Sequence, residues 1–240
     1  MHTIIVRPAG AGPFPVALIN HASTENAERR GLLPEPSYAA LTTWLVKRGY
    51  LVALPQRPGH GRTGGPYLED QGGCDDADYA SAGRGGAASI EAALAAMFAR
   101  ADVRKTGALV VGHSAGGWGA LALASRNPRG VAAIIDFAGG RGGRSFDHAN
   151  NNCAPERLIE AARMFGATAR IPTLWIYAEN DSYFAPSLVR HMADAWRYGG
   201  GRVDLALVPA FGLEGHRLAE ADDGASVWAP IVAGFLARLK

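Results

Sequence analysis

The sequence predicts a doubly wound α/β domain, in which a mostly parallel sheet is covered by helices on both faces. Apolar strand patterns alternate with helical patterns along the 240 residues, and the alternation is regular from residue 108 onward. The strand segments are apolar on both faces, which is typical of parallel strands buried from two sides. Residues 139–170 hold one helical pattern, so we expect only a minimal cap.

The first half of the chain gives three strands and two helices. The strands are apolar and partly β-branched, the first two are separated by the turn-rich "AGAGP", and Gly49 ends the first helix. Residues 56–78 are too rich in Gly and Pro for a regular element. We predict strands at 2–8, 14–21 and 50–55, and helices at 37–49 and 78–102; early glycines weaken the first half of the second helix, and its pattern is regular from 87 to 100.

The second half alternates strictly between strand and helix. We predict strands at 108–112, 131–138, 172–178 and 203–209, and helices at 115–126, 154–166, 185–199 and 224–239. Neither a repeat nor a linker interrupts the pattern, so we expect one domain over residues 1–240. Ligands of such sheets bind beyond the carboxyl ends of the strands, and we look for chemistry there.

Composition favours a small-molecule partner. Charged residues make up 19% of the chain and the net charge is +2, with no basic face that would suggest nucleic acid. No apolar run is long enough for a membrane span, and the N-terminus does not resemble a signal peptide, so we expect no membrane binding; export with a removed leader is the alternative. The expected location is cytoplasmic.

The two cysteines give little evidence for either a metal site or a disulfide. Cys74 and Cys153 lack the spacing of metal ligands, and we expect no metal and no organic cofactor. Two unlinked thiols are the favoured interpretation. A single bridge between two loops is the alternative, because both residues lie in Gly- or Asn-rich segments.

One motif points to nucleophilic catalysis. The segment "GHSAG" places Ser114 between a predicted strand and a predicted helix, the context of a nucleophile elbow. The glycines two residues before and after the serine keep that turn compact, and the following helix directs its free N–H groups at the site. A glycine-rich turn with an idle serine is the alternative.

Ser114 needs a base and an orienting acid. His216 follows the last predicted strand, on the same sheet edge as Ser114, and is the preferred base; His60 and His148, in long loops, remain possible. Asp181 follows the strand at 172–178 and is the preferred acid, with Glu179 as the reserve. Both carboxylates could instead cap the next helix.

The chain resembles the α/β-hydrolases, and within them the dienelactone hydrolase and prolyl-oligopeptidase-like esterases. The similarity runs from "VALINHAS" through "RPGHGRT", "GHSAGG" and "YAENDSYF" to "FGLEGHRL". Dienelactone hydrolases carry a cysteine nucleophile where this chain has Ser114, and many relatives have His-Gly where it has His21-Ala22. The resemblance implies an oxyanion hole built from the N–H of Ala115 and that of Ser23 or Ala22.

The expected function is hydrolysis of small to medium carboxylic esters or lactones. A peptidase or amidase with the same triad is one alternative, and a non-catalytic α/β-hydrolase scaffold is another. Phe165 or Met164, at helical spacing in the 154–166 helix, could line the acyl pocket or merely seat the helix. The residues expected to bind substrate are Phe165, Tyr183, His21, which frames the oxyanion loop, and His113, although its side chain should turn into the fold.

Overall fold

The computed structural model describes residues 1–239 and has seven strands in one sheet. The strands are β1 Thr3–Val6, β2 Val16–Asn20, β3 Leu51–Pro55, β4 Ala108–His113, β5 Val131–Phe137, β6 Thr173–Ala178 and β7 Val203–Val208. Their order is β1-β3-β2-β4-β5-β6-β7, with β1 antiparallel to β3 and every other pair parallel. This confirms the predicted mostly parallel sheet.

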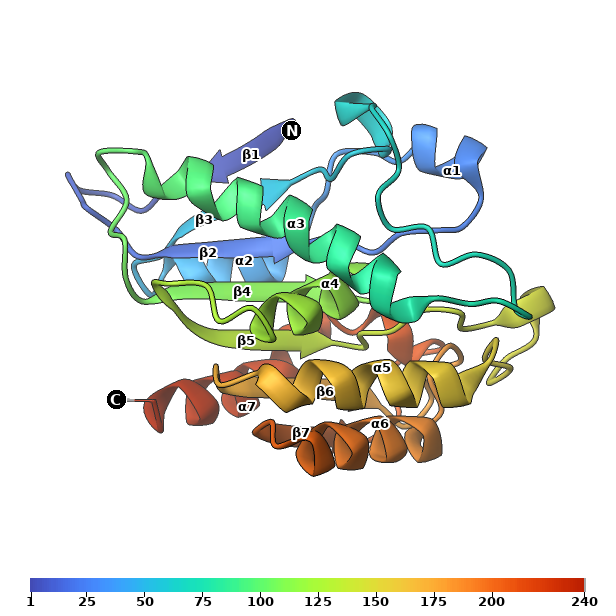
Figure 1. The fold of residues 1–240 in the computed structure, drawn as a ribbon. Helices are drawn as coiled ribbons and strands as arrows, with labels where there is room; N and C mark the ends of the chain where they lie inside the picture. Colours follow the sequence, from blue (N-terminus) through green and yellow to red (C-terminus); the bar gives the residue numbers. More distant parts are fainter. Residues whose placement is uncertain (240) are drawn as a thin grey trace.

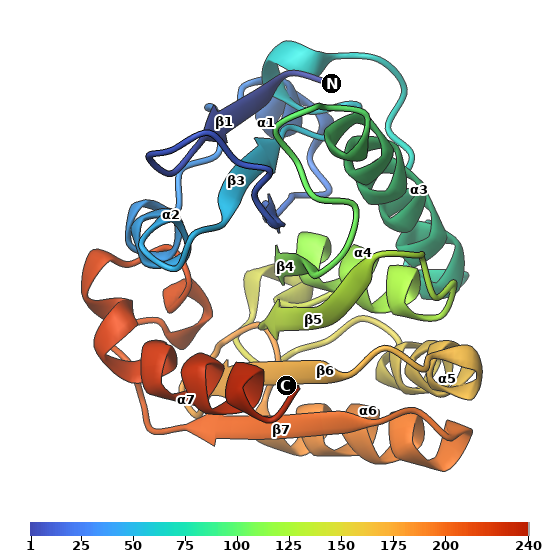
Figure 2. The same ribbon diagram turned by 90° about the vertical axis from the view of Figure 1, so that its left-hand side faces the viewer.

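Helices cover both faces of the sheet, as predicted. They are α1 Ala27–Gly31, α2 Ala39–Val46, α3 Tyr79–Phe98, α4 Ala115–Ala124, α5 Pro155–Thr168, α6 Pro186–Gly199 and α7 Ala225–Ala237. Figure 2 shows α3, α4, α5 and α6 on one side of the sheet and α2 and α7 on the other. Two apolar cores result, one on each face, since each strand contributes side chains to both.

The long helix α3 begins at Tyr79, as the pattern over residues 78–102 predicted, although glycines weaken the first half of that pattern. Glycines lower helix propensity, and three of them made this region look weak as a helix. Tertiary packing requires them instead: a Cβ on Gly85 would lie 1.7 Å from the Leu68 carbonyl oxygen, and one on Gly86 would lie 3.1 Å from the Cα of Gly119 in α4. The glycines therefore let α3 approach its neighbours closely.

The carboxyl ends of the parallel strands bring distant loops to one sheet edge (Figure 1). In register, Asn20 of β2 lies beside Gly112 of β4, and His113 lies beside Phe137 of β5. Ala178 of β6 pairs with Val208 of β7. The segments after β2, β4, β6 and β7 are those in which sequence placed the candidate site residues, so this edge is where they can meet. No helix among residues 1–239 has the length and apolarity to cross a membrane.

Candidate active site

Ser114 occupies a strained turn between β4 and α4. Its backbone has φ 55° and ψ −120°, a region that non-glycine residues adopt rarely and at a cost. The flanking glycines are needed for space: a Cβ on Gly112 would lie 2.4 Å from the Gly116 carbonyl oxygen, and one on Gly116 would lie 2.3 Å from that of Asn20. The turn thus holds the serine at the sheet edge and leaves no room for larger neighbours.

Two main-chain donors next to Ser114 are unoccupied. Neither the N–H of Ala115, at the start of α4, nor that of Ser23 makes a hydrogen bond within residues 1–239. The N–H of Ala22 instead donates to the Tyr38 hydroxyl at 3.2 Å. Ala115 and Ser23 both line the cavity that contains Ser114. Of the two alternatives for the second donor, the structure therefore favours Ser23 over Ala22.

Asp181 and His216 are in direct contact. His216 Nδ1 lies 3.0 Å from Asp181 Oδ2 and 3.2 Å from Oδ1, and both side chains are almost fully buried. The main-chain N–H groups of Tyr183 and Phe184 also donate to Asp181 Oδ1, at 2.8 and 3.1 Å. The carboxylate is therefore fixed by its own loop and holds the imidazole from one side, leaving Nε2 for another partner.

Side chains that the sequence analysis did not single out join the loops of Asp181 and His216. Glu214 Oε1 accepts from the main-chain N–H groups of Ser182 and His216, while Oε2 accepts from the Ser182 hydroxyl at 2.5 Å. Asn180 Oδ1 accepts from the N–H of Phe211, and its amide donates to the carbonyl oxygens of Phe211 and Gly212. The only sequence signal for Glu214 is its position two residues before His216.

His113 stabilises the site from beneath and does not face the cavity. Its Nε2 bonds to the main-chain oxygen of His216 at 2.8 Å, and its Nδ1 lies 3.1 Å from the Tyr38 hydroxyl. Because that hydroxyl also accepts the N–H of Ala22, one network joins the loops after β2, β4 and β7. His113 is not among the residues that line the cavity at Ser114, and its side chain points into the fold, as expected.

Both ring nitrogens of His21 form hydrogen bonds with the main chain. Its Nδ1 bonds to the Ala22 carbonyl oxygen at 2.6 Å, and its Nε2 accepts the main-chain N–H of Arg57 at 3.1 Å. Burial, together with the Arg57 charge, holds the pKa of His21 well below its ordinary value, so the ring is neutral. Both nitrogens are used within the protein, and His21 does not line the cavity.

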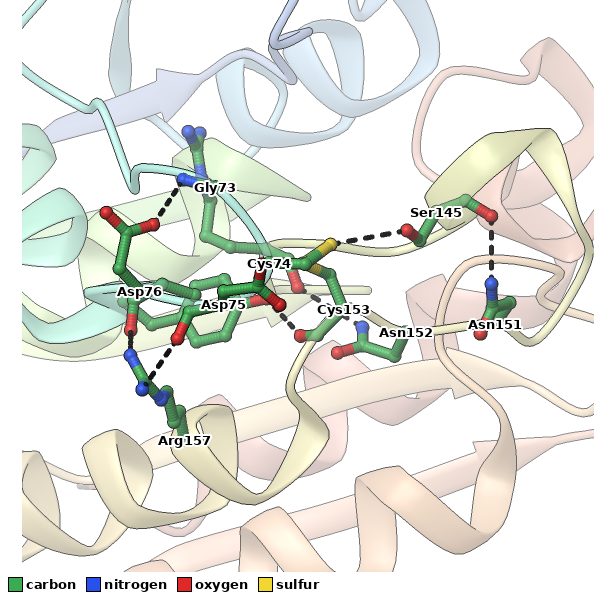
Figure 3. Close-up of a disulfide and its surroundings, with 12 residues drawn as sticks. Gly73, Cys74, Asp75, Asp76, Ser145, Asn151, Asn152, Cys153 and Arg157 are labelled. Atoms are coloured by element: carbon green, nitrogen blue, oxygen red, sulfur yellow. Dashed lines mark hydrogen bonds between the residues drawn. A yellow bond between two sulfur atoms is a disulfide. The ribbon is translucent and has the colours of Figure 1, made fainter.

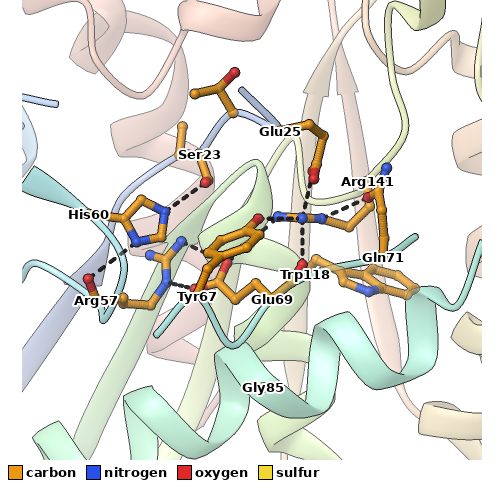
Figure 4. Close-up of polar contacts among 12 residues, drawn as sticks. Ser23, Glu25, Arg57, His60, Tyr67, Glu69, Gln71, Gly85, Trp118 and Arg141 are labelled. Atoms are coloured by element: carbon orange, nitrogen blue, oxygen red, sulfur yellow. Dashed lines mark hydrogen bonds and ion pairs between the residues drawn. The ribbon is translucent and has the colours of Figure 1, made fainter. Parts of the chain in front are cut away.

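A buried polar cluster contacts the loop after β2, which holds Ser23 (Figure 4). Ser23 Oγ lies 2.7 Å from His60 Nε2, and burial lowers the pKa of His60, which favours the neutral ring that can accept this proton. Arg57 pairs with Glu69, and Arg141 contacts Glu25, Tyr67, Gln71 and the Glu69 main chain. The buried charges are thus paired, as their desolvation requires.

A cavity of about 610 Å³ opens at Ser114. Its wall includes Ser23, Ala115 and Tyr183, and much of the rest comes from residues 140–147. Phe165 lies elsewhere: its ring packs on Trp118 at a centroid distance of 5.2 Å, and it is 4% exposed within the α3–α5 core. Met164 is exposed on the outer face of α5. For Phe165 the structure therefore supports the alternative in which it seats the helix, whereas Met164 lies neither in the core nor in the wall of this cavity.

A disulfide joins two walls of this cavity (Figure 3). Cys74 and Cys153, separated by 79 positions, are bonded and both line the cavity. The favoured interpretation of two unlinked thiols was wrong, because sequence spacing does not show that the two loops meet at the same edge. Disulfides persist mainly in oxidising compartments, so the bond stands against the expected cytoplasmic location.

The triad candidates are not all in contact. Among residues 1–239 the Ser114 hydroxyl has no hydrogen bond to His216 or to any other side chain; catalytic hydrogen bonds are often long in unliganded enzymes and shorten in the substrate complex. Glu179 follows β6 directly and makes no bond to a histidine, which leaves Asp181 as the acid that meets His216. Residues 1–239 contain no group of three His, Cys, Asp or Glu side chains arranged to hold a metal ion.

Comparison with known proteins gives a structural likeness only. No family model matches the sequence, and no curated protein matches it either. Among solved structures, esterase PE8 is 16% identical, with TM-score 0.65 over 99% of this chain and 98% of that one. A protein assigned as a dienelactone hydrolase, from Klebsiella pneumoniae subsp. pneumoniae, is 15% identical, with TM-score 0.59 over 98% of this chain and 99% of that one.

A third similar structure is larger. The acylaminoacyl peptidase of Pyrococcus horikoshii is 14% identical, with TM-score 0.66; the match covers 98% of this chain but 39% of the peptidase. At identities this low, the likeness establishes architecture and not substrate. Together with the sheet order and the elbow at Ser114, it shows that this chain has the α/β-hydrolase fold.

Proposed function

We propose that this protein is a serine hydrolase that cleaves small to medium carboxylic esters or lactones. The observation that carries the proposal is the combination at one sheet edge of a strained Ser114, two unoccupied main-chain donors and an Asp181–His216 pair. The esterases among the similar structures agree with it. A non-catalytic scaffold would not need this costly backbone at Ser114.

The reaction is acyl transfer in two steps. His216, oriented by Asp181, takes the Ser114 proton as Oγ attacks the carbonyl carbon, and the N–H groups of Ala115 and Ser23 stabilise the oxyanion. The protonated imidazole then gives its proton to the departing alkoxide, which leaves an acyl-serine. Water attacks that ester with His216 again as base, releasing the acid and restoring Ser114. In this mechanism the protein uses its own residues throughout.

Substrate size follows from the cavity. Its wall carries Thr24, Glu25, Gln71, Arg141 and Arg144, beside five glycines, so much of it is polar. A polar wall gives no gain for burying a long alkyl chain, whereas a short acyl group needs little apolar surface. We therefore expect aryl esters of two to four acyl carbons to be hydrolysed with higher kcat/KM than esters of ten or twelve.

The test is a set of matched variants assayed on those esters. Ser114→Ala should lower kcat by several powers of ten while thermal unfolding stays close to that of the wild type. Asp181→Asn should lower kcat steeply by favouring the wrong imidazole tautomer, and Glu179→Gln, the matched control, should have little effect. If Ser114→Ala keeps more than a tenth of the wild-type activity, Ser114 is not the nucleophile.

A peptidase or amidase is the second candidate, because the acylaminoacyl peptidase shares the architecture. The same triad can cleave either bond, and the difference lies in the leaving group and the binding wall. N-acyl amino acid anilides assayed beside esters of the same acyl group distinguish the two. We expect the esters to have the higher kcat/KM; a preference for the anilides would favour the amidase.

A further inference from the structure

The geometry points to Tyr183 as a positioning residue that holds the imidazole of His216 and stabilises its protonated form. This inference rests on the proposed function. The ring of Tyr183 stacks on that of His216 with centroids 4.2 Å apart and an angle of 26° between the planes. No other aromatic ring lies as close or as parallel to His216 within residues 1–239; Phe184 and His113 are tilted at 5.7 and 5.0 Å.

Tyr183 contacts both members of the acid–base pair. Its main-chain N–H donates to Asp181 Oδ1 at 2.8 Å, while its side chain covers a face of the His216 ring. The imidazole is thus held at its edge by a carboxylate and on its face by an aromatic ring. Two such contacts restrict the two motions, tilt and rotation, that would move Nε2 away from Ser114.

Tyr183 is supported in turn by the glycine-rich loop before α5. A Cβ on Gly143 would lie 2.8 Å from the Tyr183 carbonyl oxygen and 2.9 Å from its Cβ, so only glycine lets the loop pack this closely. The Arg144 guanidinium lies 5.7 Å from the Tyr183 ring centroid and donates to the Ser182 hydroxyl. This packing gives a structural reason for glycine at position 143 in the segment "GGRGGR", residues 139–144.

The stack has a chemical consequence. His216 becomes a cation when it takes the serine proton, and the face of an aromatic ring is electron-rich, so the ring attracts the imidazolium more than the neutral imidazole. The contribution therefore appears in the transition state and in the tetrahedral intermediate. By this argument Tyr183 should affect kcat more than KM, which is the reverse of a residue whose only task is to bind substrate.

The proposed role does not depend on the hydroxyl of Tyr183. It makes no hydrogen bond within residues 1–239, and the ring is half-buried. Tyr183→Phe therefore keeps the stack, and Tyr183→Leu removes it while retaining an apolar side chain. The remaining titratable and charged groups around His216 are unchanged in both variants; they are Asp181, His113 on β4, Arg144 on the loop before α5, and Glu214, Arg217 and Glu220 on its own segment.

The experiment compares wild type, Tyr183→Phe and Tyr183→Leu on one short aryl ester across pH 5 to 9. We expect Tyr183→Leu to lose about tenfold in kcat with KM changed less than threefold, and the midpoint of its kcat/KM profile to move to lower pH. Tyr183→Phe should restore both quantities to near the wild-type values. Gly143→Ala, whose Cβ would crowd the carbonyl oxygen and Cβ of Tyr183, should act in the same direction as Tyr183→Leu.

Two results would overturn the inference while leaving the proposed function intact. One is a Tyr183→Leu enzyme whose KM rises with kcat and pH midpoint unchanged, which would make Tyr183 a substrate contact. The other is a Tyr183→Phe enzyme as impaired as Tyr183→Leu, which would give the role to the hydroxyl. A wild-type enzyme that shows no Ser114-dependent ester hydrolysis would instead refute the proposed function.

Discussion

Asp136 should make the stability of this protein fall as pH rises, and replacing it by asparagine should remove that dependence. The side chain is fully buried on β5, beneath the elbow. Oδ2 accepts from the Tyr177 hydroxyl at 3.0 Å, but Oδ1 has no partner within residues 1–239. Burial raises the pKa of Asp136 from 3.8 to about 8 despite the hydrogen bonds from Tyr177 and the Gly139 N–H.

The sign of the effect follows from proton binding. Between about pH 4 and pH 8 the folded chain keeps a proton on Asp136 that the unfolded chain has released, so unfolding becomes easier as pH rises through this window. A separation of about four pH units, at 1.36 kcal/mol each, corresponds to a loss on the order of 6 kcal/mol across the window. The stabilisation that protonated Asp136 contributes to the folded state is fully present below about pH 4 and is lost above about pH 8.

Urea unfolding at pH 5, 6, 7, 8 and 9 measures this directly. The free energy of unfolding of Asp136→Asn minus that of the wild type should grow by about 1.4 kcal/mol per pH unit up to about pH 8 and then level off. Asp194→Asn, on a carboxylate that is 71% exposed, is the matched control and should show no such growth. If the difference in the free energy of unfolding between Asp136→Asn and the wild type stays constant from pH 5 to 8, Asp136 does not keep its proton in the folded chain over this range.

Three further changes test other parts of the structure. Cys74→Ala/Cys153→Ala opens the loop closed by the disulfide and should cost about 3 kcal/mol, or roughly 6 to 12 °C in Tm by calorimetry; an unchanged Tm would mean that the bond contributes nothing. Phe165→Ala should destabilise by about 3 to 5 kcal/mol without altering the ester chain-length preference, and a widened preference would contradict its place in the core. Glu214→Gln should lower kcat several-fold by loosening the Ser182 and His216 main chains, with Glu179→Gln as the unaffected control in the same assay.

Local patterns were enough to predict the architecture. The apolar strands and the spacing of the helices predicted the sheet, and the GHSAG segment predicted a turn at Ser114 because its glycines have a steric reason that can be read locally. The early glycines of α3 looked only unfavourable in a helix, because the contacts that require them, with Leu68 and α4, are distant in sequence.

What sequence could not predict depends on contacts across the fold. His113 was expected at the substrate, yet it bonds to the His216 main chain 103 positions away. The disulfide, the Glu214 bonds and the stack of Tyr183 on His216 likewise need the loops to be placed in space. The missing partner of Asp136 Oδ1 was equally hidden, since a single polar residue in "VAAIIDFA" gives no sign of whether it has a hydrogen-bond partner.

Labelling by a fluorophosphonate directly tests whether Ser114 is an activated nucleophile. Attack by an activated serine on phosphorus forms an O–P bond and expels fluoride, so the adduct can be located by peptide mass mapping. We predict one adduct per chain, on the peptide that contains Ser114, with labelling absent in Ser114→Ala and slowed in Asp181→Asn. An unlabelled chain, or an adduct on Ser23, whose hydroxyl lies 2.7 Å from His60 Nε2, would contradict the assignment of Ser114 as the nucleophile.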